Sequence, residues 1–248
     1  MPRETDTVTR RAFIDSELAV GEEIRLEDDA FRHLCKVLRL REGDEVTLFN
    51  GRGGEFHGRI TAVEKRSATV TIEAGDMIDR SPGLEWQLLQ AVSKGDRMDY
   101  TLQKSTELGV HSIQPFHAER SVVNLSGDRA RKREEHWRGV VRSACEQCGM
   151  NRVPEIRELA DIREALSRVH AETRLLLDPR ADDSISGVEI GNSVALLIGP
   201  EGGLSDAEIA AAGDAGFRGI RMGSRILRTE TAAVVAAAVL LARTGDLD

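Results

Sequence analysis

The chain of 248 residues has few aromatic residues, few cysteines and no long apolar run. Aromatic side chains make up 4% of the sequence, which argues against an aromatic stacking platform for single-stranded nucleic acid and against a core that is mainly a β-sandwich. Three cysteines fit a reducing environment, so we expect a cytoplasmic protein. The longest apolar run, from Ala232 to Ala242, is shorter than the roughly 20 residues of a membrane-spanning helix. The N-terminal segment shows no apolar stretch typical of a secretory signal.

An excess of basic residues is also missing, because 34 lysines and arginines are outnumbered by 42 aspartates and glutamates. The net charge of −8 by itself argues against nucleic-acid binding. The charge is uneven, however, and residues 94–157 carry 12 basic and 9 acidic side chains. Such basic stripes are usually solvated helix faces, and the functional alternative is local contact with RNA phosphates. The two stripes are Arg32, Lys36, Arg39 and Arg41, and Arg129, Arg131, Lys132 and Arg133.

The first third of the chain predicts a small β-rich domain. Strand patterns are found at residues 46–49, 55–60 and 68–72. Residues 50–54, Asn-Gly-Arg-Gly-Gly, have the chemistry of a hairpin turn, and one helix is expected near residues 28–38. We therefore expect a compact barrel over residues 1–76, followed by a linker over residues 77–83 that contains Ser81-Pro82-Gly83.

Beyond this linker, the pattern alternates between strands and helices. Apolar or β-branched strands are expected at residues 86–92, 112–116, 153–156, 174–177, 194–198 and 219–222. Helices are expected at residues 96–108, 128–148 and 161–169, after Ser205, and at 229–243. This alternation predicts an α/β domain over residues 84–248, with a mostly parallel sheet and helices on both faces. In such sheets, ligands bind beyond the carboxyl ends of the strands.

The first candidate ligand loop is Gly199-Pro200-Glu201-Gly202-Gly203, directly after the strand predicted at residues 194–198. Three glycines in five positions let the main chain approach a ligand closely and adopt positive φ. An ordinary strand-to-helix turn is the simpler interpretation, but such a turn rarely needs three glycines and a proline. Because no Gly-Lys-Ser/Thr follows and no G-x-G-x-x-G pattern occurs, the loop predicts a site for a planar ligand without a phosphate chain.

The second candidate loop runs from Met222 to Ala232, between a predicted strand and a predicted helix. Glu230 falls in the first turn of that helix, where a carboxylate is favourable for dipole reasons alone. Arg228 lies just before the turn, and a cation near a helix N-terminus is unfavourable unless an anion is nearby. Arg228 is therefore the stronger functional candidate of the two.

Five motifs occur in an order typical of one enzyme family. They are Gln103 to Val110 (QKSTELGV), Ala144 to Gly149 (ACEQCG), Asn151 to Pro154 (NRVP), Gly199 to Gly203 (GPEGG) and Ile226 to Ala232 (ILRTETA). Together they closely resemble the RsmE-type 16S ribosomal RNA uridine-N3 methyltransferases, a branch of the SPOUT superfamily. The resemblance spans essentially the whole chain, and only Met150 departs mildly from the polar or basic residue usual in the family.

The resemblance implies an N-terminal PUA-like RNA-binding barrel and a C-terminal α/β methyltransferase domain with a deep trefoil knot. It also implies S-adenosylmethionine as methyl donor, an obligate homodimer, and one specific uridine in the 16S RNA of the small ribosomal subunit as substrate. The planar adenine and phosphate-free sulfonium of this donor agree with the glycine loop. Carried over residue by residue, the cofactor site comprises Leu177, Ile198, Gly199, Pro200, Glu201, Gly202, Gly203, Met222, Gly223, Ile226, Leu227 and Thr231.

A mechanism can be assigned on this basis. Methylation of uridine N3 requires loss of the imide proton, and negative charge develops on the uracil carbonyl oxygens. We assign to Arg228 the role of stabilising that charge, with Arg11 or Arg120 as alternatives. Glu230 is expected either to accept the imide proton or to orient Arg228. Candidate RNA-binding residues are Arg10, Arg11, Arg32, Lys36, Arg39, Arg120, Arg129, Arg131, Lys132 and Arg133.

No metal site is expected, since Cys145 and Cys148 lie together on a predicted helix and the remaining cysteine and histidines offer no second ligand pair. Two alternative functions stay open. One is a SPOUT enzyme acting on tRNA or on a ribose 2′-oxygen, against which the Ile226–Ala232 segment argues. The other is a non-catalytic RNA-binding protein, against which the glycine loop together with Arg228 and Glu230 argues.

Overall fold

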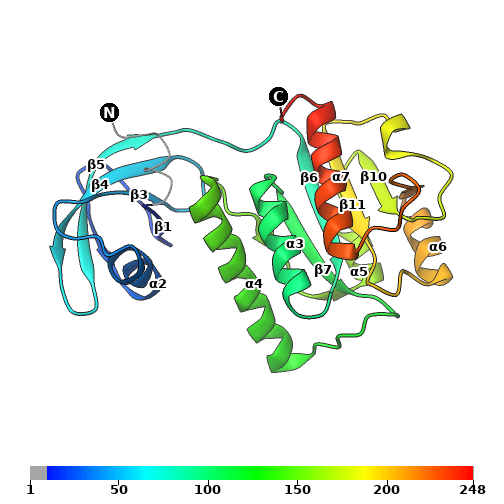
Figure 1. Cartoon of the computed structure of the whole chain (residues 1–248), viewed down its shortest axis with the longest axis horizontal. Coiled ribbons are helices and arrows are strands. Elements are labelled where there is room, and N and C mark those ends of the chain that lie inside the picture. Colours follow the sequence, from blue (N-terminus) through cyan, green and yellow to red (C-terminus); the bar gives the residue numbers. More distant parts are fainter. Residues whose placement is uncertain (1–9, 248) are drawn as a thin grey trace. The chain divides into compact units, whose positions relative to one another are not determined.

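The computed structural model describes residues 10–247, which form two compact units (Figure 1). The first unit contains residues 10–81 together with Arg142–Val153, and the second contains Pro82–Val141 and residues 154–247. Helix α4 (Gly127–Cys148) therefore contributes residues to both units. The sequence does not reveal this sharing, because the end of α4 and the residues after it pack in the first unit through contacts distant along the chain, among them Cys145 and Met150 against Phe49.

The first unit is built on a curled five-stranded sheet with the strand order β1-β3-β4-β5-β2 (Figure 1). Its strands are β1 (Arg11–Phe13), β2 (Glu23–Leu26), β3 (Glu45–Phe49), β4 (Glu55–Val63) and β5 (Ala68–Asp76). Neighbouring strands are antiparallel, except that β1 and β3 are parallel. The three strands predicted from sequence are confirmed as β3, β4 and β5. Gly53 and Gly54 adopt φ of +100° and +75° between β3 and β4, which explains the glycines of the predicted turn.

The helix predicted near residues 28–38 is present but irregular. It begins as α2 (Asp28–Phe31) and continues as the π-helical turn η1 (Arg32–Val37), and Leu38 N donates to His33 O. Phe31 and Leu34 face the core of the first unit. Arg39 follows with φ of +59°, a left-handed conformation that is uncommon for arginine. Because of the wider π turn and the left-handed Arg39, the basic residues Arg32, Lys36 and Arg39 do not have the spacing of one regular α-helical face.

The second unit contains a fully parallel sheet with the order β12-β10-β11-β6-β7-β8, to which β9 adds by pairing with β7. Its strands are β6 (Glu85–Ala91), β7 (Ser112–His117), β8 (Glu155–Ile156), β9 (Ala160–Asp161), β10 (Thr173–Leu177), β11 (Ser193–Ile198) and β12 (Arg218–Ile220). The strand predicted at residues 153–156 is reduced to two residues, because Val153 belongs to the first unit. From β6, the next strands along the chain, β7 and β8, extend the sheet towards one edge. The later strands β10, β11 and β12 lie on the other side of β6, and β11 is the one that pairs with β6.

Helices cover both faces of the parallel sheet, as predicted. They are α3 (Asp96–Glu107), α5 (Ile162–Ser167), α6 (Asp206–Asp214) and α7 (Thr229–Arg243), with a short helical turn η2 (Ile185–Gly187). α3 and α7 lie side by side (Figure 1), whereas Ala165 of α5 and Ala212 of α6 pack against Leu197 on the other face. Within residues 10–247, every helix is too short or too polar to span a lipid bilayer. The trefoil knot stays a prediction.

Candidate active site

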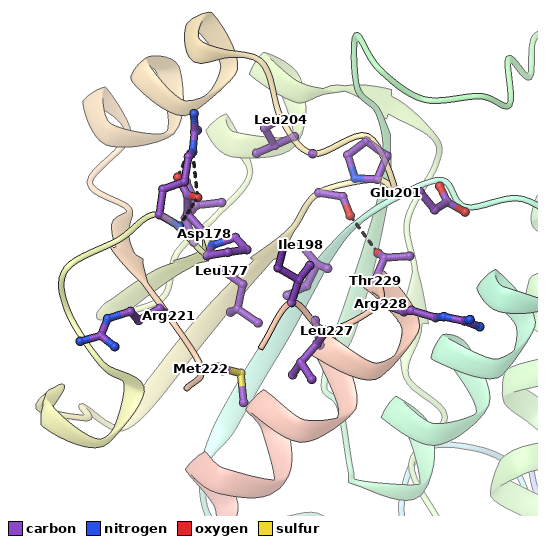
Figure 2. Close-up of a pocket in the computed structure, with 18 of the residues that line it drawn as sticks. Leu177, Asp178, Ile198, Glu201, Leu204, Arg221, Met222, Leu227, Arg228 and Thr229 are labelled. Carbon is purple, nitrogen blue, oxygen red and sulfur yellow. Dashed lines mark hydrogen bonds and ion pairs between the residues drawn. The ribbon is translucent and has the colours of Figure 1, made fainter. Parts of the chain in front are cut away.

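A cavity of about 650 Å³ opens in the second unit beyond the carboxyl ends of three adjacent strands (Figure 2). Leu177 of β10, Ile198 of β11 and Ile220 of β12 form its apolar floor. This is the edge where ligands bind in parallel α/β sheets. Eleven of the twelve cofactor residues inferred from sequence line the cavity, namely Leu177, Ile198, Gly199, Pro200, Glu201, Gly202, Gly203, Met222, Gly223, Ile226 and Leu227. Thr231, the twelfth, lies in α7 outside the lining.

Two glycines of the first loop are closely packed, and a third has a left-handed backbone conformation. A Cβ atom on Gly202 would lie 3.1 Å from the Cβ of Arg120, and one on Gly199 would lie 3.2 Å from the Cγ of Leu204. Gly203 adopts φ of +69°, a conformation that side-chain-bearing residues rarely adopt. The loop therefore turns sharply and presents main chain, rather than side chains, to the cavity.

The two candidate loops are joined by a buried hydrogen-bond chain. Gln90 Nε2 donates to Thr229 Oγ1 at 3.0 Å, and Thr229 Oγ1 donates to Gly199 O at 2.8 Å, a contact drawn in Figure 2. Gln90 is completely buried at the end of β6 and Thr229 begins α7. The chain holds the start of α7 against the glycine loop. Neither residue was singled out from the sequence, where a polar residue in an apolar strand is the only available signal.

Arg228 lies just before α7 and its side chain is exposed. It lines the cavity, and within residues 10–247 it forms no ion pair. Figure 2 shows Arg228 and Glu201 on one side of the cavity and Asp178 and Arg221 on the other. A cation at a helix N-terminus is electrostatically unfavourable. The geometry is thus compatible with the predicted role of Arg228 toward an anionic group.

Glu230 does not contact Arg228. The closest cation to its carboxylate is Arg97 of α3, with Arg97 Nε 3.9 Å from Glu230 Oε1. Arg228 is the extended N-cap residue of α7, and it forms no ion pair with Glu230 among the described residues. The two roles assigned to Glu230 from the sequence stay predictions. Glu230 Oε2 is buried and has no hydrogen-bond partner among the described residues.

Glu201 carries the main charge interaction of the glycine loop. Its Oε1 accepts hydrogen bonds from Arg97 Nη1 at 2.8 Å and from Lys94 N at 3.4 Å. Burial tends to raise the pKa of Glu201, but hydrogen bonds from its own backbone N–H, from Arg97 and from Lys94 N outweigh it and hold the pKa below its usual value. The loop therefore carries a full negative charge at neutral pH.

Arg11 is placed in the core of the first unit. Its Nη1 donates to Glu55 Oε2 at 2.5 Å and its Nη2 donates to Asn151 Oδ1 at 2.6 Å, and the Arg11 side chain is 4% exposed. The assignment of Arg11 to catalysis or RNA contact is therefore corrected to a structural one, because its guanidinium is enclosed by protein. Arg120 is exposed at the cavity and donates to Leu204 O at 3.4 Å.

The remaining predicted RNA-binding residues lie on the surfaces of the two units. Arg32, Lys36 and Arg39 are exposed in the first unit, where Arg32 pairs with Asp29 and Lys36 Nζ lies 4.9 Å from the centre of the Phe31 ring. Arg10 is half-buried there. The first turns of α4 carry the second stripe in the second unit. Its members are Arg129, Arg131, Lys132 and Arg133, all at least partly exposed.

Several lining residues escape sequence reasoning. They are Arg97, Asp178, Pro179, Arg180, Leu204 and Arg221, which lie outside both candidate loops. Asp178 directly follows β10, and Arg97 falls in the first turn of α3. Arg97, like Arg228, is a cation near a helix N-terminus, where a positive charge is unfavourable. The same criterion applied to the sequence could therefore have identified Arg97.

The cysteines have ordinary packing roles. Burial raises the pKa of the Cys145 thiol, which makes it unreactive, and Cys145 Sγ donates to Arg152 O at 3.8 Å. Among residues 10–247, no group of three histidine, cysteine, aspartate or glutamate side chains is placed to hold a metal ion.

Comparisons with known families agree with this site. Residues 80–241 match a family described as an RNA methyltransferase domain, and residues 26–73 match one described as an RNA methyltransferase PUA domain. The ribosomal RNA small subunit methyltransferase E of Buchnera aphidicola (subspecies Schizaphis graminum) is 34% identical over 239 residues, covering 96% of this chain and 97% of that protein.

Two solved structures resemble the whole chain. The ribosomal RNA small subunit methyltransferase E of Neisseria gonorrhoeae, bound to S-adenosylmethionine, is 39% identical with a TM-score of 0.88. A methyltransferase of Legionella pneumophila in complex with the same cofactor is 37% identical with a TM-score of 0.92. Each comparison covers 95% of this chain and 98% of the other. The predicted α/β fold class and the resemblance drawn from the five motifs are confirmed.

Proposed function

The chain belongs to the RNA methyltransferase family of the ribosomal RNA small subunit methyltransferases E, and on this premise we propose that it methylates N3 of one specific uridine in 16S ribosomal RNA. The methyl donor is S-adenosylmethionine. The observation that carries the proposal is the cavity beyond β10, β11 and β12, with its apolar floor and its wall of glycine main chain. The placement of this pocket on the C-terminal unit agrees with the residues matched by the methyltransferase family.

The chemistry of the cavity fits the proposed cofactor. Apolar side chains such as Ile198 and Leu227 suit a planar adenine, and main-chain groups of the two loops are proposed to form hydrogen bonds to its edge. Charged groups of both signs at the rim, Asp178 and Arg180 among them, suit the ammonium and carboxylate of a methionine moiety. The cofactor supplies an electrophilic methyl group on a sulfonium.

The residues of the chain supply position and charge. Arg228 is proposed to stabilise the negative charge that develops on the uracil carbonyl oxygens, and Arg120 is the alternative cation at the rim. Glu230 is proposed to take the imide proton, because it lies in the first turn of α7 directly after the cavity-lining residues Arg228 and Thr229, although Glu230 itself does not line the cavity. Alignment of N3 with the methyl group then accounts for much of the rate.

We propose an RNA-binding domain over residues 1–76, joined by a linker at 77–83 to a methyltransferase domain over residues 84–248. The first unit contains residues 10–76 of the RNA-binding domain, together with residues 77–81 and Arg142–Val153. Its match to a PUA family supports this role, as do the exposed cations Arg32, Lys36 and Arg39. We also propose that the protein works as a homodimer in the cytoplasm, where ribosomal RNA is assembled into subunits.

The proposed reaction is tested by mapping methylated nucleosides. Small-subunit RNA from cells that lack this protein is digested and analysed by mass spectrometry, and the same RNA is then incubated with purified protein and S-adenosylmethionine. We expect one 3-methyluridine to be absent from the mutant RNA and restored by the protein. Methylation at a ribose oxygen, or no cofactor binding by calorimetry, contradicts the proposal.

Replacement of Gly203 by valine is expected to weaken S-adenosylmethionine binding about 10-fold or more. The φ of +69° at Gly203 is strained for a β-branched residue, and a cost of about 1–3 kcal/mol falls on the loop that lines the cavity. Calorimetry with the cofactor measures the change. Gly213→Ala is the matched control, because Gly213 lies in α6 with nothing within 4 Å of an added Cβ. Equal affinities of both variants would show that the loop does not hold the cofactor.

Reversal of charge at Arg129 and Lys132 is expected to weaken RNA binding and to reduce its dependence on salt. Both are exposed and lie three residues apart on α4, whereas Arg131 is already paired with Asp128. If each contacts one phosphate, the slope of log K against log salt falls by about 2 in the R129E/K132E variant. Fluorescence anisotropy over a salt series measures the slope. Arg163→Glu on α5 is the control, and an unchanged slope in R129E/K132E refutes the contacts.

A further inference from the structure

Arg97 occupies an electrostatically unfavourable position that two glutamates compensate. It lies in the first turn of α3, where the helix dipole opposes a positive charge. Its guanidinium contacts Glu201 Oε1 at 2.8 Å and lies 3.9 Å from Glu230 Oε1. The two glutamates belong to the two loops that form the cavity, and α3 belongs to neither. Arg97 is therefore shared by both loops.

The contact between Arg97 and Glu230 matters because the Glu230 carboxylate has few other partners among the described residues. Its side chain is 13% exposed, and Oε2 is buried without a hydrogen bond among the described residues. Within that part of the chain, Arg97 is also the only cation within 4 Å of its carboxylate. A buried carboxylate without a positive partner is costly. Without Arg97, the nearest compensation along the chain would be the neighbouring Arg228, drawn out of its exposed position.

The same arrangement explains why Arg228 stays free. Arg228 is exposed beside the cavity and makes no ion pair within residues 10–247, although an acidic residue follows it two positions later. Arg97 of α3 compensates the negative charge of Glu230. The Glu230 carboxylate therefore does not attract Arg228, and Arg228 can interact with a substrate. The Gln90–Thr229–Gly199 hydrogen bonds fix the backbone of the same helix start, but they carry no charge.

We propose that Arg97 is a positioning residue for methyl transfer, which bridges Glu201 and Glu230 and thereby keeps Glu230 in place and Arg228 available to the substrate. This inference rests on the proposed function and adds a residue to it. Arg97 acts through Glu230 and Arg228, so its loss changes turnover more than cofactor affinity. A lysine at this position keeps the positive charge, and the Arg97→Lys variant is therefore expected to retain most of the kcat of the original protein.

The test compares Arg97→Gln, Arg97→Lys, Glu230→Gln and the double variant R97Q/E230Q. In R97Q we expect kcat to fall about 10- to 100-fold, with the Kd for S-adenosylmethionine by calorimetry within about threefold of the original, since the apolar floor of the cavity and the glycine loop are unchanged. Arg97→Lys should recover most of the lost kcat. The double variant should be no slower than the slower single variant, because both changes interrupt the same interaction.

The outcomes separate this inference from the proposed function. An unmodified protein that binds no cofactor and methylates no uridine refutes the function itself. An active protein in which R97Q keeps normal kcat, or in which R97Q and E230Q multiply their effects, overturns the role of Arg97 alone. A parallel loss of kcat, cofactor affinity and melting temperature in R97Q also overturns it, since that pattern indicates general unfolding. Arg163→Gln, an exposed arginine on α5, controls for loss of one positive charge.

Discussion

Replacement of Arg228 by alanine is expected to lower kcat about 10²- to 10³-fold while leaving the affinity for S-adenosylmethionine nearly unchanged. The side chain is exposed beside the cavity and forms no ion pair within residues 10–247, so it is free to meet the charge that develops on uracil. Single-turnover methylation of small-subunit RNA measures kcat, and calorimetry measures cofactor binding. Near-normal turnover would show that another cation, with Arg120 first among them, has this role.

The stability of the same variant separates a catalytic role from a structural one. Arg228 lies just before α7, where its charge opposes the helix dipole. Its removal should therefore leave the melting temperature unchanged or raise it, by an amount equivalent to about 0.3–1 kcal/mol. Arg163→Ala is the control for loss of an exposed arginine, and it should change neither kcat nor stability appreciably. A lower melting temperature in R228A would indicate that the side chain holds the loop.

Replacement of Glu55 by alanine is expected to destabilise the first unit by about 3–5 kcal/mol. Glu55 accepts from Arg11 at 2.5 Å and from Arg80 at 2.8 Å, and its side chain is 7% exposed. Its removal leaves the Arg11 guanidinium buried without a counter-charge. Native-state hydrogen exchange of the β3 and β4 amides measures the loss in this unit directly. Glu45→Ala is the matched control, because the Glu45–Arg59 pair is exposed and contributes about 1 kcal/mol at most.

The same carboxylate gives the first unit a pH dependence of known sign. Burial tends to raise the pKa of Glu55, but hydrogen bonds from Arg80 and Arg11 outweigh it and lower the pKa from 4.5 to about 2. The unfolded chain therefore binds the proton more readily than the folded one, and the stabilisation is complete above pH 4.5 and lost as the pH falls toward 2. The shift corresponds to about 3 kcal/mol.

Glu55→Gln provides the comparison for this pH effect. It keeps the shape of the side chain without its charge, so the stability of E55Q should change less between pH 4.5 and pH 2 than that of the original protein. Hydrogen exchange at several pH values, corrected for the intrinsic rates, measures both curves. Parallel curves would mean that Glu55 is not the group whose protonation destabilises this unit.

The local chemistry of the chain was sufficient to place the ligand loops. Gly203 needs its positive φ and Gly202 its missing Cβ, and both requirements are visible as glycines after an apolar strand. The strand and helix alternation likewise predicted the parallel sheet, because buried strands and amphipathic helices have different hydrophobic periods. The short strands β1, β2 and β9 were not predicted, since two to four residues without an apolar run carry little periodic signal.

Tertiary structure alone decided which charged side chains face a ligand and which are structural. From the sequence, Arg228 was assigned to the charge on uracil with Arg11 as an alternative, and Glu230 was expected either to accept the proton or to orient Arg228. In the fold, Arg11 is paired with Glu55, 44 residues away, and Glu230 lies beside Arg97 of another helix. Glycine loops and strand ends follow from backbone conformation, which neighbouring residues determine. The partner of a charge depends on which distant segments pack around it, and no local pattern contains that information.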